Sequence, residues 1–194
     1  MCQYLETIAI LNGDPLHLPY HLHRVAGNSR VNIQNFITTL QLPKRDLLKL
    51  SIVYDSKNIL SSKIVPYKTR NILSFKIIHN NDIDYSKKYA NRSALEAMVT
   101  QKGDCDEILI IQNGLITDTS FSNIIFKKEN DWVTPKTPLL KGTCRARLLE
   151  KGIIEPADIE ISHLKQFSHF MLINAMLDFD ETRAFPMVKE TFKV

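Results

Sequence analysis

The sequence predicts an α+β fold in two subdomains, with mixed or antiparallel sheets. Three observations favour this class: several segments rich in β-branched residues, Asn-Gly pairs between such segments, and a few separate helical stretches. The strand-rich halves meet near residues 80–86. This position predicts a small N-terminal domain over residues 1–82 and a larger C-terminal domain over residues 83–194.

The predicted strands begin with the alternating segment YLETIAIL, which ends at the hairpin signal Asn12-Gly13. Other strands are predicted in LSIVYD, KIVPYKTRNILSFKIIHN and FMLINAMLDF, the last as a strand that leads into a turn. Three more are predicted within DEILIIQNGLITDTSFSNIIFKK and DWVTP, broken by a tight Asn113-Gly114 turn. Strands therefore dominate both predicted domains.

Helical spacing of apolar residues predicts four further stretches: YHLHRVAGNSRVNI, FITTLQLPKRDLLKL, KKYANRSALEAMVTQKG and GTCRARLLEKGI. The third opens with the adjacent lysines Lys87 and Lys88 and ends at Gly103. The fourth is short and is bounded by Gly142 and Gly152. Each of the last two helices thus begins at residues that could carry chemistry.

Composition narrows the functional classes. The chain has 194 residues and a formal charge of +4 that is spread along the sequence, which does not indicate nucleic-acid binding. Its three cysteines are odd in number and unpatterned, as expected for reduced thiols in the cytoplasm. Neither a membrane-spanning apolar run nor a secretion signal is visible. We therefore expect a soluble protein of the cytoplasm.

The pair Gly142-Thr143 is a candidate anion site because it stands immediately before a helical run. The first N–H groups of a helix have no partner within the helix, the helix dipole is positive there, and glycine allows close approach. The alternative is that Thr143 is an ordinary helix N-cap.

The segment HLPYHLH contains three histidines, but it does not predict a metal site. His21 and His23 would point to different faces of a helix, and no nearby cysteine or acidic residue completes a ligand set. Arg24 follows directly, and its planar fork of donors matches an oxyanion such as phosphate. Otherwise Arg24 is a solvated surface charge.

Two polar residues interrupt predicted strands. Asp118 lies in a strand-like segment where an acid is disfavoured, and it could hold a protonated heteroaromatic nitrogen. The alternative is a turn aspartate bonded to its own backbone. Asn174 lies in the apolar run LINAM and needs hydrogen-bond partners if it is buried. A core amide with all its hydrogen bonds made is the alternative.

The order of these features resembles the class IV (fold type IV) pyridoxal-phosphate enzymes. That family includes branched-chain aminotransferases, D-amino-acid aminotransferases and 4-amino-4-deoxychorismate lyase. The resemblance covers most of the chain, and its most specific part is the ordered series KYANR, DEILIIQNGLITDTSFSNIIF and TPKTPLLKGTCR. It implies a fold of the D-amino-acid aminotransferase type. Family members usually run well beyond this length, which implies a shortened N-terminal domain.

The resemblance assigns the covalent and phosphate contacts of pyridoxal 5'-phosphate. KYANR is similar to the K-x-x-N-R around the family's Schiff-base lysine, so Lys88 matches that lysine and Lys87 is its solvated neighbour. Arg24 matches the phosphate arginine of an H-x-x-R pattern. The backbone phosphate cradle matches Gly142, Thr143 and Cys144, in the sequence GTCR, and a second phosphate contact matches Asn174 and Ala175.

The resemblance also assigns the acid that pairs with the pyridine nitrogen. The family pattern G-x-x-x-E-x-x-x-x-N places that acid at Asp118 and the amide at Asn123. The family's acid is usually glutamate, so this chain has an arm shorter by one methylene. Both residues are expected to contact the cofactor.

The implied reaction is the conversion of 4-amino-4-deoxychorismate to 4-aminobenzoate and pyruvate, a step of folate biosynthesis. The K-x-x-N-R pattern favours this lyase. An aminotransferase of branched-chain or D-amino acids is the alternative, and a non-enzymatic pyridoxal-phosphate-binding protein is a third possibility. The resemblance further implies a homodimer, because family members build each active site at a two-fold interface. No partner of nucleic acid or membrane is expected.

Overall fold

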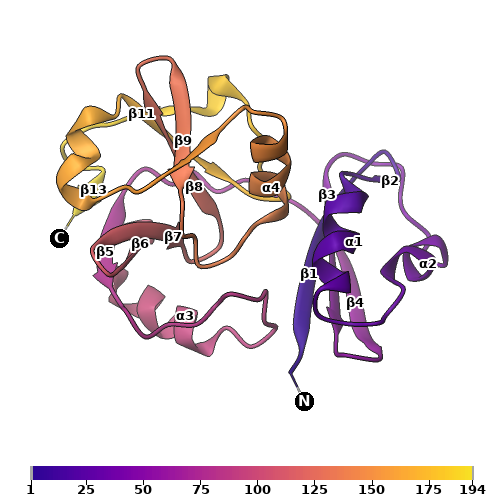
Figure 1. Ribbon diagram of the computed structural model, residues 1–194. Helices are drawn as coiled ribbons and strands as arrows, with labels where there is room; N and C mark the ends of the chain where they lie inside the picture. The colour runs from indigo at the N-terminus through magenta and orange to yellow at the C-terminus, as the bar shows by residue number, and fades with distance from the viewer. Residues whose placement is uncertain (1, 194) are drawn as a thin grey trace. The chain divides into compact units, whose positions relative to one another are not determined.

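The computed structural model describes residues 2–193, which form two compact units (Figure 1). The first unit comprises Met1–Thr69 with Lys87–Asn91, and the second comprises Arg70–Ser86 with Arg92–Val194. The predicted domains had bounds of 1–82 and 83–194. The units divide earlier because the strand at Phe75–His79 pairs within the sheet of the second unit.

The first unit is built on an antiparallel sheet in the order β2-β1-β3-β4. Its strands are β1 Tyr4–Leu11, β2 Asp14–Pro15, β3 Leu48–Tyr54 and β4 Ile59–Pro66. The predicted Asn12-Gly13 turn joins β1 to β2, and both residues have positive φ, of 53° and 90°. This hairpin is confirmed.

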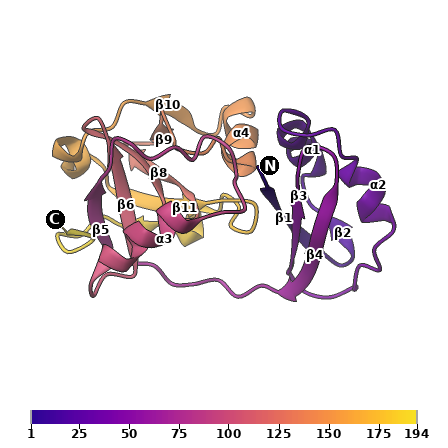
Figure 2. The same cartoon turned by 90° about the horizontal axis from the view of Figure 1, so that it is seen from below.

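Helices α1 (Leu18–Ala26) and α2 (Ile33–Thr38) pack on one face of this sheet (Figures 1 and 2). Pro19 lies in the first turn of α1, where its missing N–H costs nothing. Val25 of α1 and Ile33 and Ile37 of α2 join the buried side chains of β1 and β3 in one core. Both helices thus bury an apolar stripe against the sheet.

The second predicted helical stretch, residues 36–50, is partly wrong. Helix α2 ends at Thr38, and residues 48–50 already belong to β3. The side chains of β3 alternate between buried and half-buried positions from Leu48 to Tyr54, which is the period of a strand. Pro43 lies between the two elements, where helix cannot continue easily.

Lys87 and Lys88 do not open a helix, contrary to the sequence prediction. Helix α3 is Ser93–Val99, and the segment 87–91 is not helical but hydrogen-bonds to the start of β1, with an isolated bridge between Tyr4 and Tyr89. The helical spacing of apolar residues in SALEAMV continues upstream into residues 87–91, but these residues pair with β1 and do not form a helix. The predicted end holds, because Gly103 follows a final 3-10 turn with φ of 57°.

The second unit contains a nine-stranded sheet with the path β10-β9-β8-β7-β6-β5-β13, while β11 pairs with β8 and β12. The predicted three strands after residue 106 are in fact four. The strands of this sheet are β5 Phe75–His79, β6 Glu107–Gln112, β7 Leu115–Thr119, β8 Asn123–Lys128, β9 Asp131–Pro135, β10 Glu155–Ala157, β11 His169–Ile173, β12 Phe185–Pro186 and β13 Phe192–Lys193.

Strands β5 and β6 run parallel and are joined by a crossover that contains α3. The strands from β6 to β9 are antiparallel, so the sheet is mixed, as predicted. Strands β7 and β8 share only the pair Asp118–Asn123. A four-residue span at this hairpin therefore brings the two predicted acid-site residues opposite each other.

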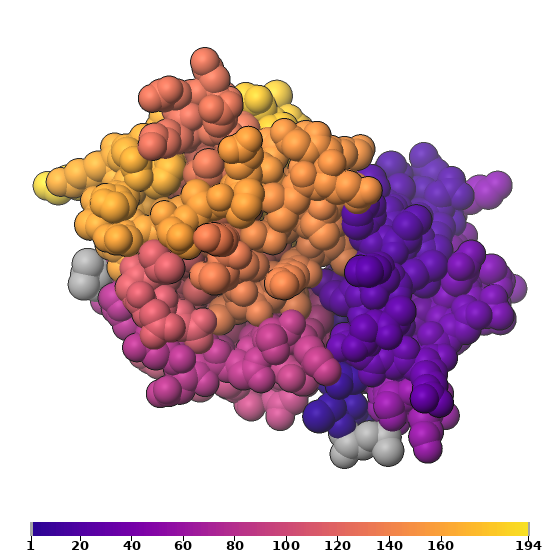
Figure 3. Space-filling view, viewed as in Figure 1, coloured from indigo at the N-terminus to yellow at the C-terminus, as the bar shows by residue number. Residues whose placement is uncertain are grey.

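Helix α4, Thr143–Glu150, lies where the sequence predicts it and packs on the sheet through Cys144 and Leu148. Their core partners include Ile125 of β8, Trp132 of β9 and Met171 of β11. The chain from β9 onward, in orange and yellow, covers much of the face of this unit that Figure 3 shows. Residues of β8, β9 and β11 thus hold helix α4 against the sheet.

Among residues 2–193, no helix is long and apolar enough to cross a membrane.

Candidate functional site

Asp118 lies near the end of β7 and is buried, with 4% of its surface exposed. The turn that follows is held by Thr119, whose hydroxyl oxygen accepts the N–H of Ser122 at 3.1 Å. Asp118 itself does not bond to its own turn. The alternative of an ordinary turn aspartate is therefore wrong, and the strand position predicted for this acid is confirmed.

Neutral donors hold the Asp118 carboxyl group. Its Oδ1 accepts Nδ2–H of Asn123 at 2.7 Å, and its Oδ2 accepts the backbone N–H of Leu140 at 2.9 Å. Burial raises the pKa of Asp118 to about 7, although these bonds and the charge of Arg145 act in the opposite direction. A cation placed against this carboxyl group would favour its ionised form.

Asn123 and Gly142 approach each other very closely. Asn123 Nδ2 donates to both Asp118 and the carbonyl oxygen of Leu140, the second bond being 2.8 Å long. A Cβ atom added to Gly142 would lie 2.1 Å from Asn123 Oδ1, which is far inside van der Waals contact. Glycine at this position therefore makes room for the amide that holds the acid.

The N-terminus of α4 begins directly after this glycine. Gly142 is the N-cap, in extended conformation and without a side-chain capping bond, so the alternative of Thr143 as N-cap is wrong. Thr143 and Cys144 are the first helical residues, and both are buried. Their N–H groups precede the first intrahelical bond, donated by Ala146 to the Gly142 carbonyl at 2.9 Å. An anion could be bound there.

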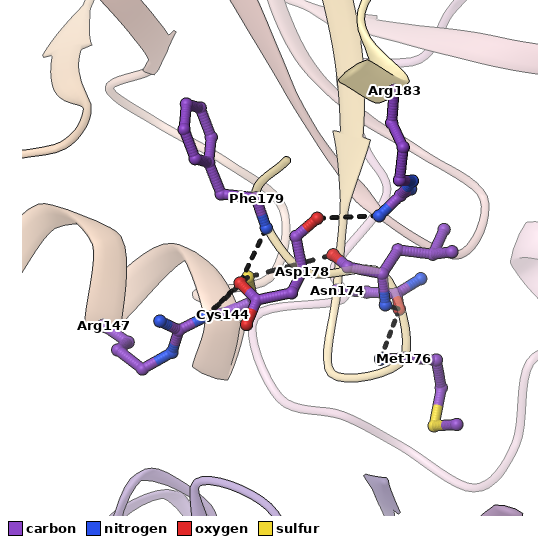
Figure 4. Close-up of polar contacts among 8 residues, drawn as sticks. Cys144, Arg147, Asn174, Met176, Asp178, Phe179 and Arg183 are labelled. Carbon is purple, nitrogen blue, oxygen red and sulfur yellow. Dashed lines mark hydrogen bonds and ion pairs between the residues drawn. The ribbon is translucent and has the colours of Figure 1, made fainter. Parts of the chain in front are cut away.

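The turn after β11 contains Asn174 and Ala175. Asn174 is half-buried, and its Oδ1 accepts the N–H groups of Met176 and Leu177 at 2.8 and 3.0 Å (Figure 4). The amide oxygen thus shapes the turn, and because the residue is half-buried it is not the core amide of the alternative. Ala175 lies at the tip of this turn, between Asn174 and the residues that Asn174 binds.

Helix α4 and this turn are joined by polar contacts (Figure 4). Arg147 Nη2 forms an ion pair with Oδ1 of Asp178, and Cys144 Sγ lies 3.8 Å from the same oxygen. Arg183 Nη1 donates to the Asp178 carbonyl at 2.7 Å. Burial raises the pKa of Cys144 to about 12, so its thiol stays neutral. The two predicted phosphate elements are therefore fixed to one another.

Arg24 lies on α1 in the first unit and is not a solvated surface charge. Its Nε and Nη2 donate to Oε1 and Oε2 of Glu6, each at 2.7 Å. His21 Nδ1 lies 2.7 Å from the same Oε2. His21 is buried and His23 exposed, as expected for opposite helix faces. Among residues 2–193 no group of three His, Cys, Asp or Glu side chains could hold a metal ion.

Lys88 is also in the first unit. Its carbonyl accepts the N–H of Leu5 at 2.8 Å, so backbone pairing with β1 fixes the position of this residue. Its side chain is half-buried, whereas Lys87 is exposed, with Nζ 5.8 Å from the ring centre of Tyr4. The two adjacent lysines thus differ in environment.

A family model described as amino-transferase class IV matches residues 49–179. The chain belongs to the class IV aminotransferase family. The match contains the Lys88 segment, the Asp118 hairpin, α4 and the Asn174 turn. The resemblance inferred from the motifs is confirmed, and so is the α+β fold of the fold type IV enzymes.

Relatives cover nearly the whole chain. An uncharacterised protein of Haemophilus influenzae is 35% identical over 186 residues, which is 91% of this chain and 98% of that protein. The crystal structure of a candidate 4-amino-4-deoxychorismate lyase from Haemophilus somnus has 33% identity and a TM-score of 0.84, covering 92% of this chain and 98% of the other.

A third similar structure is the PLP-bound form of a hypothetical aminotransferase from Mycobacterium tuberculosis. Its TM-score is 0.76 and its identity is 15%, with 97% of this chain and 84% of that chain covered. At this identity the likeness shows the fold alone.

The family's predicted site residues fall in both units. Asp118, Asn123, the start of α4 and the Asn174 turn belong to the second unit, where the contacts above connect acid to helix and helix to turn. Arg24 and Lys88 belong to the first. Within each unit, the contacts described above hold these residues in place.

Sequence reasoning missed three groups that order these residues. Leu140 contributes only backbone atoms, for which no sequence signal exists. Arg92, the arginine of KYANR, donates through Nη2 to the carbonyl of Ser120 at 2.9 Å, and thus supports the hairpin of Asp118. Glu6 had a visible signal, since it is a charge at an inward position of an alternating strand.

Gly142→Ala is expected to destabilise the ligand-free protein by about 1–3 kcal/mol, because the new methyl group displaces a bonded, buried amide. Urea unfolding measures the change. Gly27→Ala is the matched control: Gly27 also has a negative φ, of −70°, and its nearest neighbour would lie 3.5 Å from the methyl group. Equal effects of the two substitutions would show that Asn123 turns away freely.

Proposed function

We propose that this protein binds pyridoxal 5'-phosphate and converts 4-amino-4-deoxychorismate to 4-aminobenzoate and pyruvate. The observation that carries the proposal is the buried Asp118, held by Asn123, whose amide packs against Gly142, the N-cap of α4. The likeness to the Haemophilus somnus protein, over nearly the whole of both chains, supports the choice of lyase.

The second unit fits the cofactor's charges. A phosphate dianion suits the N–H groups at the start of α4, where Thr143 and Cys144 are buried and α4 has no side-chain cap. A cationic ring nitrogen suits Asp118, whose carboxyl group receives hydrogen bonds from uncharged donors alone. Burial makes this carboxyl group costly to ionise without such a cation.

Each residue has a distinct role in this proposal. Asp118 keeps the ring nitrogen protonated, Arg24 and the start of α4 bind the phosphate, and Lys88 bonds to the cofactor and then serves as base. Asn123 orients Asp118 through its 2.7 Å hydrogen bond. When bound, the cofactor supplies an electron-accepting ring for the reacting carbon.

The reaction balances without another substrate. Lys88 takes the proton from the carbon that bears the amino group, and the neighbouring carbon–oxygen bond breaks with its electrons on the leaving enolpyruvate. Enolpyruvate takes up a proton and leaves as pyruvate, while the remaining ring becomes aromatic. Nothing is oxidised or reduced overall, and no keto acid is required.

The test is to supply the holoenzyme with 4-amino-4-deoxychorismate alone and, separately, with an amino acid and 2-oxoglutarate. The proposal expects 4-aminobenzoate and pyruvate in equal amounts, with no need for a keto acid. Product formation only in the second mixture would identify an aminotransferase. Cofactor binding with turnover in neither mixture would favour a non-enzymatic protein.

We extend the proposal to a cytoplasmic homodimer. The dimer is supported by the family resemblance, because family members build each active site at a two-fold interface. Light scattering of the active protein at micromolar concentration measures its mass. A mass of one 22.3 kDa chain with full activity would contradict the dimer.

A further inference from the structure

Glu6 occupies a position that strand periodicity reserves for an apolar residue. Along β1 the buried positions include Tyr4, Glu6, Ile8 and Ile10, and the Glu6 side chain is fully buried. The other three belong to the core between β1 and helices α1 and α2. A carboxylate in this place is expensive unless it is paired and hydrogen-bonded.

Both partners of this carboxylate come from α1. His21 and Arg24 are three residues apart and therefore lie on the same face of the helix. A carboxylate accepts only, so the 2.7 Å contact places the proton of His21 on Nδ1. Burial alone would raise the pKa of Glu6, but Arg24 and His21 outweigh it and lower that pKa to about 2. Glu6 is thus an anion at neutral pH.

The contact with Arg24 is bidentate, which fixes the plane of the guanidinium group as well as its position. A guanidinium group has five N–H donors, and Glu6 receives one from Nε and one from Nη2. The remaining three lie on Nη1 and the outer side of Nη2. Glu6 does not use these three donors, and 13% of the Arg24 side chain is exposed, so an anion has access to this side chain.

We propose that Glu6 is a positioning residue that holds the Arg24 guanidinium group in the orientation in which it binds the cofactor phosphate, with His21 completing the hydrogen bonds of Glu6. The inference rests on the proposed use of pyridoxal phosphate. Because Glu6 neutralises Arg24, the arginine contributes directed hydrogen bonds more than net charge. Its contribution therefore depends on Glu6 and not merely on the presence of a cation.

The experiment compares the affinity of the full-length protein for pyridoxal phosphate and for pyridoxal, which lacks the phosphate. Glu6→Gln is expected to weaken pyridoxal phosphate binding about tenfold, or 1.4 kcal/mol, because an amide cannot accept both Arg24 donors and the His21 proton. Pyridoxal binding should stay within about twofold. The ratio of the two affinities isolates the phosphate contact.

Arg24→Ala should lower the same ratio, and the double variant should lower it no further than Arg24→Ala alone. Asp46→Asn is the control, because it removes an exposed acidic charge from the same unit and should leave the ratio unchanged. Thermal unfolding of each ligand-free variant reports folding separately. Should Glu6→Gln not fold, Glu6→Asp carries the test, because its shorter arm cannot keep the bidentate contact.

The outcomes separate the inference from the proposed function. An unchanged ratio in Glu6→Gln, with a reduced ratio in Arg24→Ala, would overturn the positioning role and leave Glu6 as a structural pair. An unchanged ratio in Arg24→Ala would place the phosphate elsewhere and also overturn it. Failure of the unaltered protein to bind pyridoxal phosphate would instead refute the proposed function.

Discussion

Lys88→Ala is expected to lower the rate of 4-aminobenzoate formation at least about 1,000-fold, because in the proposed function Lys88 is both the covalent anchor and the base. The fold should survive, since the pairing of this segment with β1 uses the Lys88 carbonyl and not its side chain. Steady-state rates and circular dichroism of the purified variant measure the two effects.

Lys87→Ala is the matched control. Lys87 is exposed, and its contact with the Tyr4 ring is long, at 5.8 Å, so the rate should remain within about twofold of the unaltered enzyme. Borohydride reduction of cofactor-loaded protein, followed by peptide mapping, should label Lys88. Label on Lys87 would reverse the assignment of the two lysines.

The strands and their turns were predictable because their signals are local. Asn12-Gly13 and Asn113-Gly114 both adopt the positive φ angles that such turns require, and the strands beside them alternate or run apolar as expected. The start of α3 was not predictable in this way. Its upstream segment is not helical because it pairs with β1, more than eighty residues earlier, and helical spacing does not detect such a partner.

The candidate site shows the same division. Motif order indicates Asp118 and Asn123 five positions apart, and the hairpin brings them together by strand pairing. The bond from Leu140 to Asp118 spans 22 residues and uses a backbone N–H, which leaves no trace in residue type. Likewise, the sequence indicates why Gly142 would suit an anion, but its closeness to Asn123 emerges only from packing.

Asp118→Asn is expected to lower the rate at least about 100-fold, because an amide cannot keep the ring nitrogen of the cofactor protonated. Local structure changes little in outline, since an amide oxygen replaces one acceptor. The new NH2 group, however, faces another donor, which is either Nδ2 of Asn123 or the backbone N–H of Leu140, so one of the two hydrogen bonds is lost. Asp118→Glu retains the charge and should have a rate above that of Asp118→Asn, measured in the same assay.

A second readout for Asp118 requires no turnover. Its pKa in the fold is raised from 3.8 to about 7, so its contribution to stability is full below about pH 4 and is lost as the pH rises through 7. The loss amounts to roughly 4 kcal/mol at most, at about 1.4 kcal/mol per pH unit. Glu6 acts in a separate window, because its lowered pKa removes stability only as the pH falls from 4.5 toward 2.

Urea unfolding of the ligand-free protein should therefore give a lower free energy of unfolding at pH 8 than at pH 5, and Asp118→Asn should lack most of this difference. Bound cofactor should remove it too, because a protonated ring nitrogen beside Asp118 stabilises the carboxylate and lowers its pKa. A pH dependence that persists unchanged in the cofactor-loaded protein would mean that the ring nitrogen does not meet Asp118. In that case the electron-accepting ring would need another partner, and the shorter acid of this chain would have only a structural role.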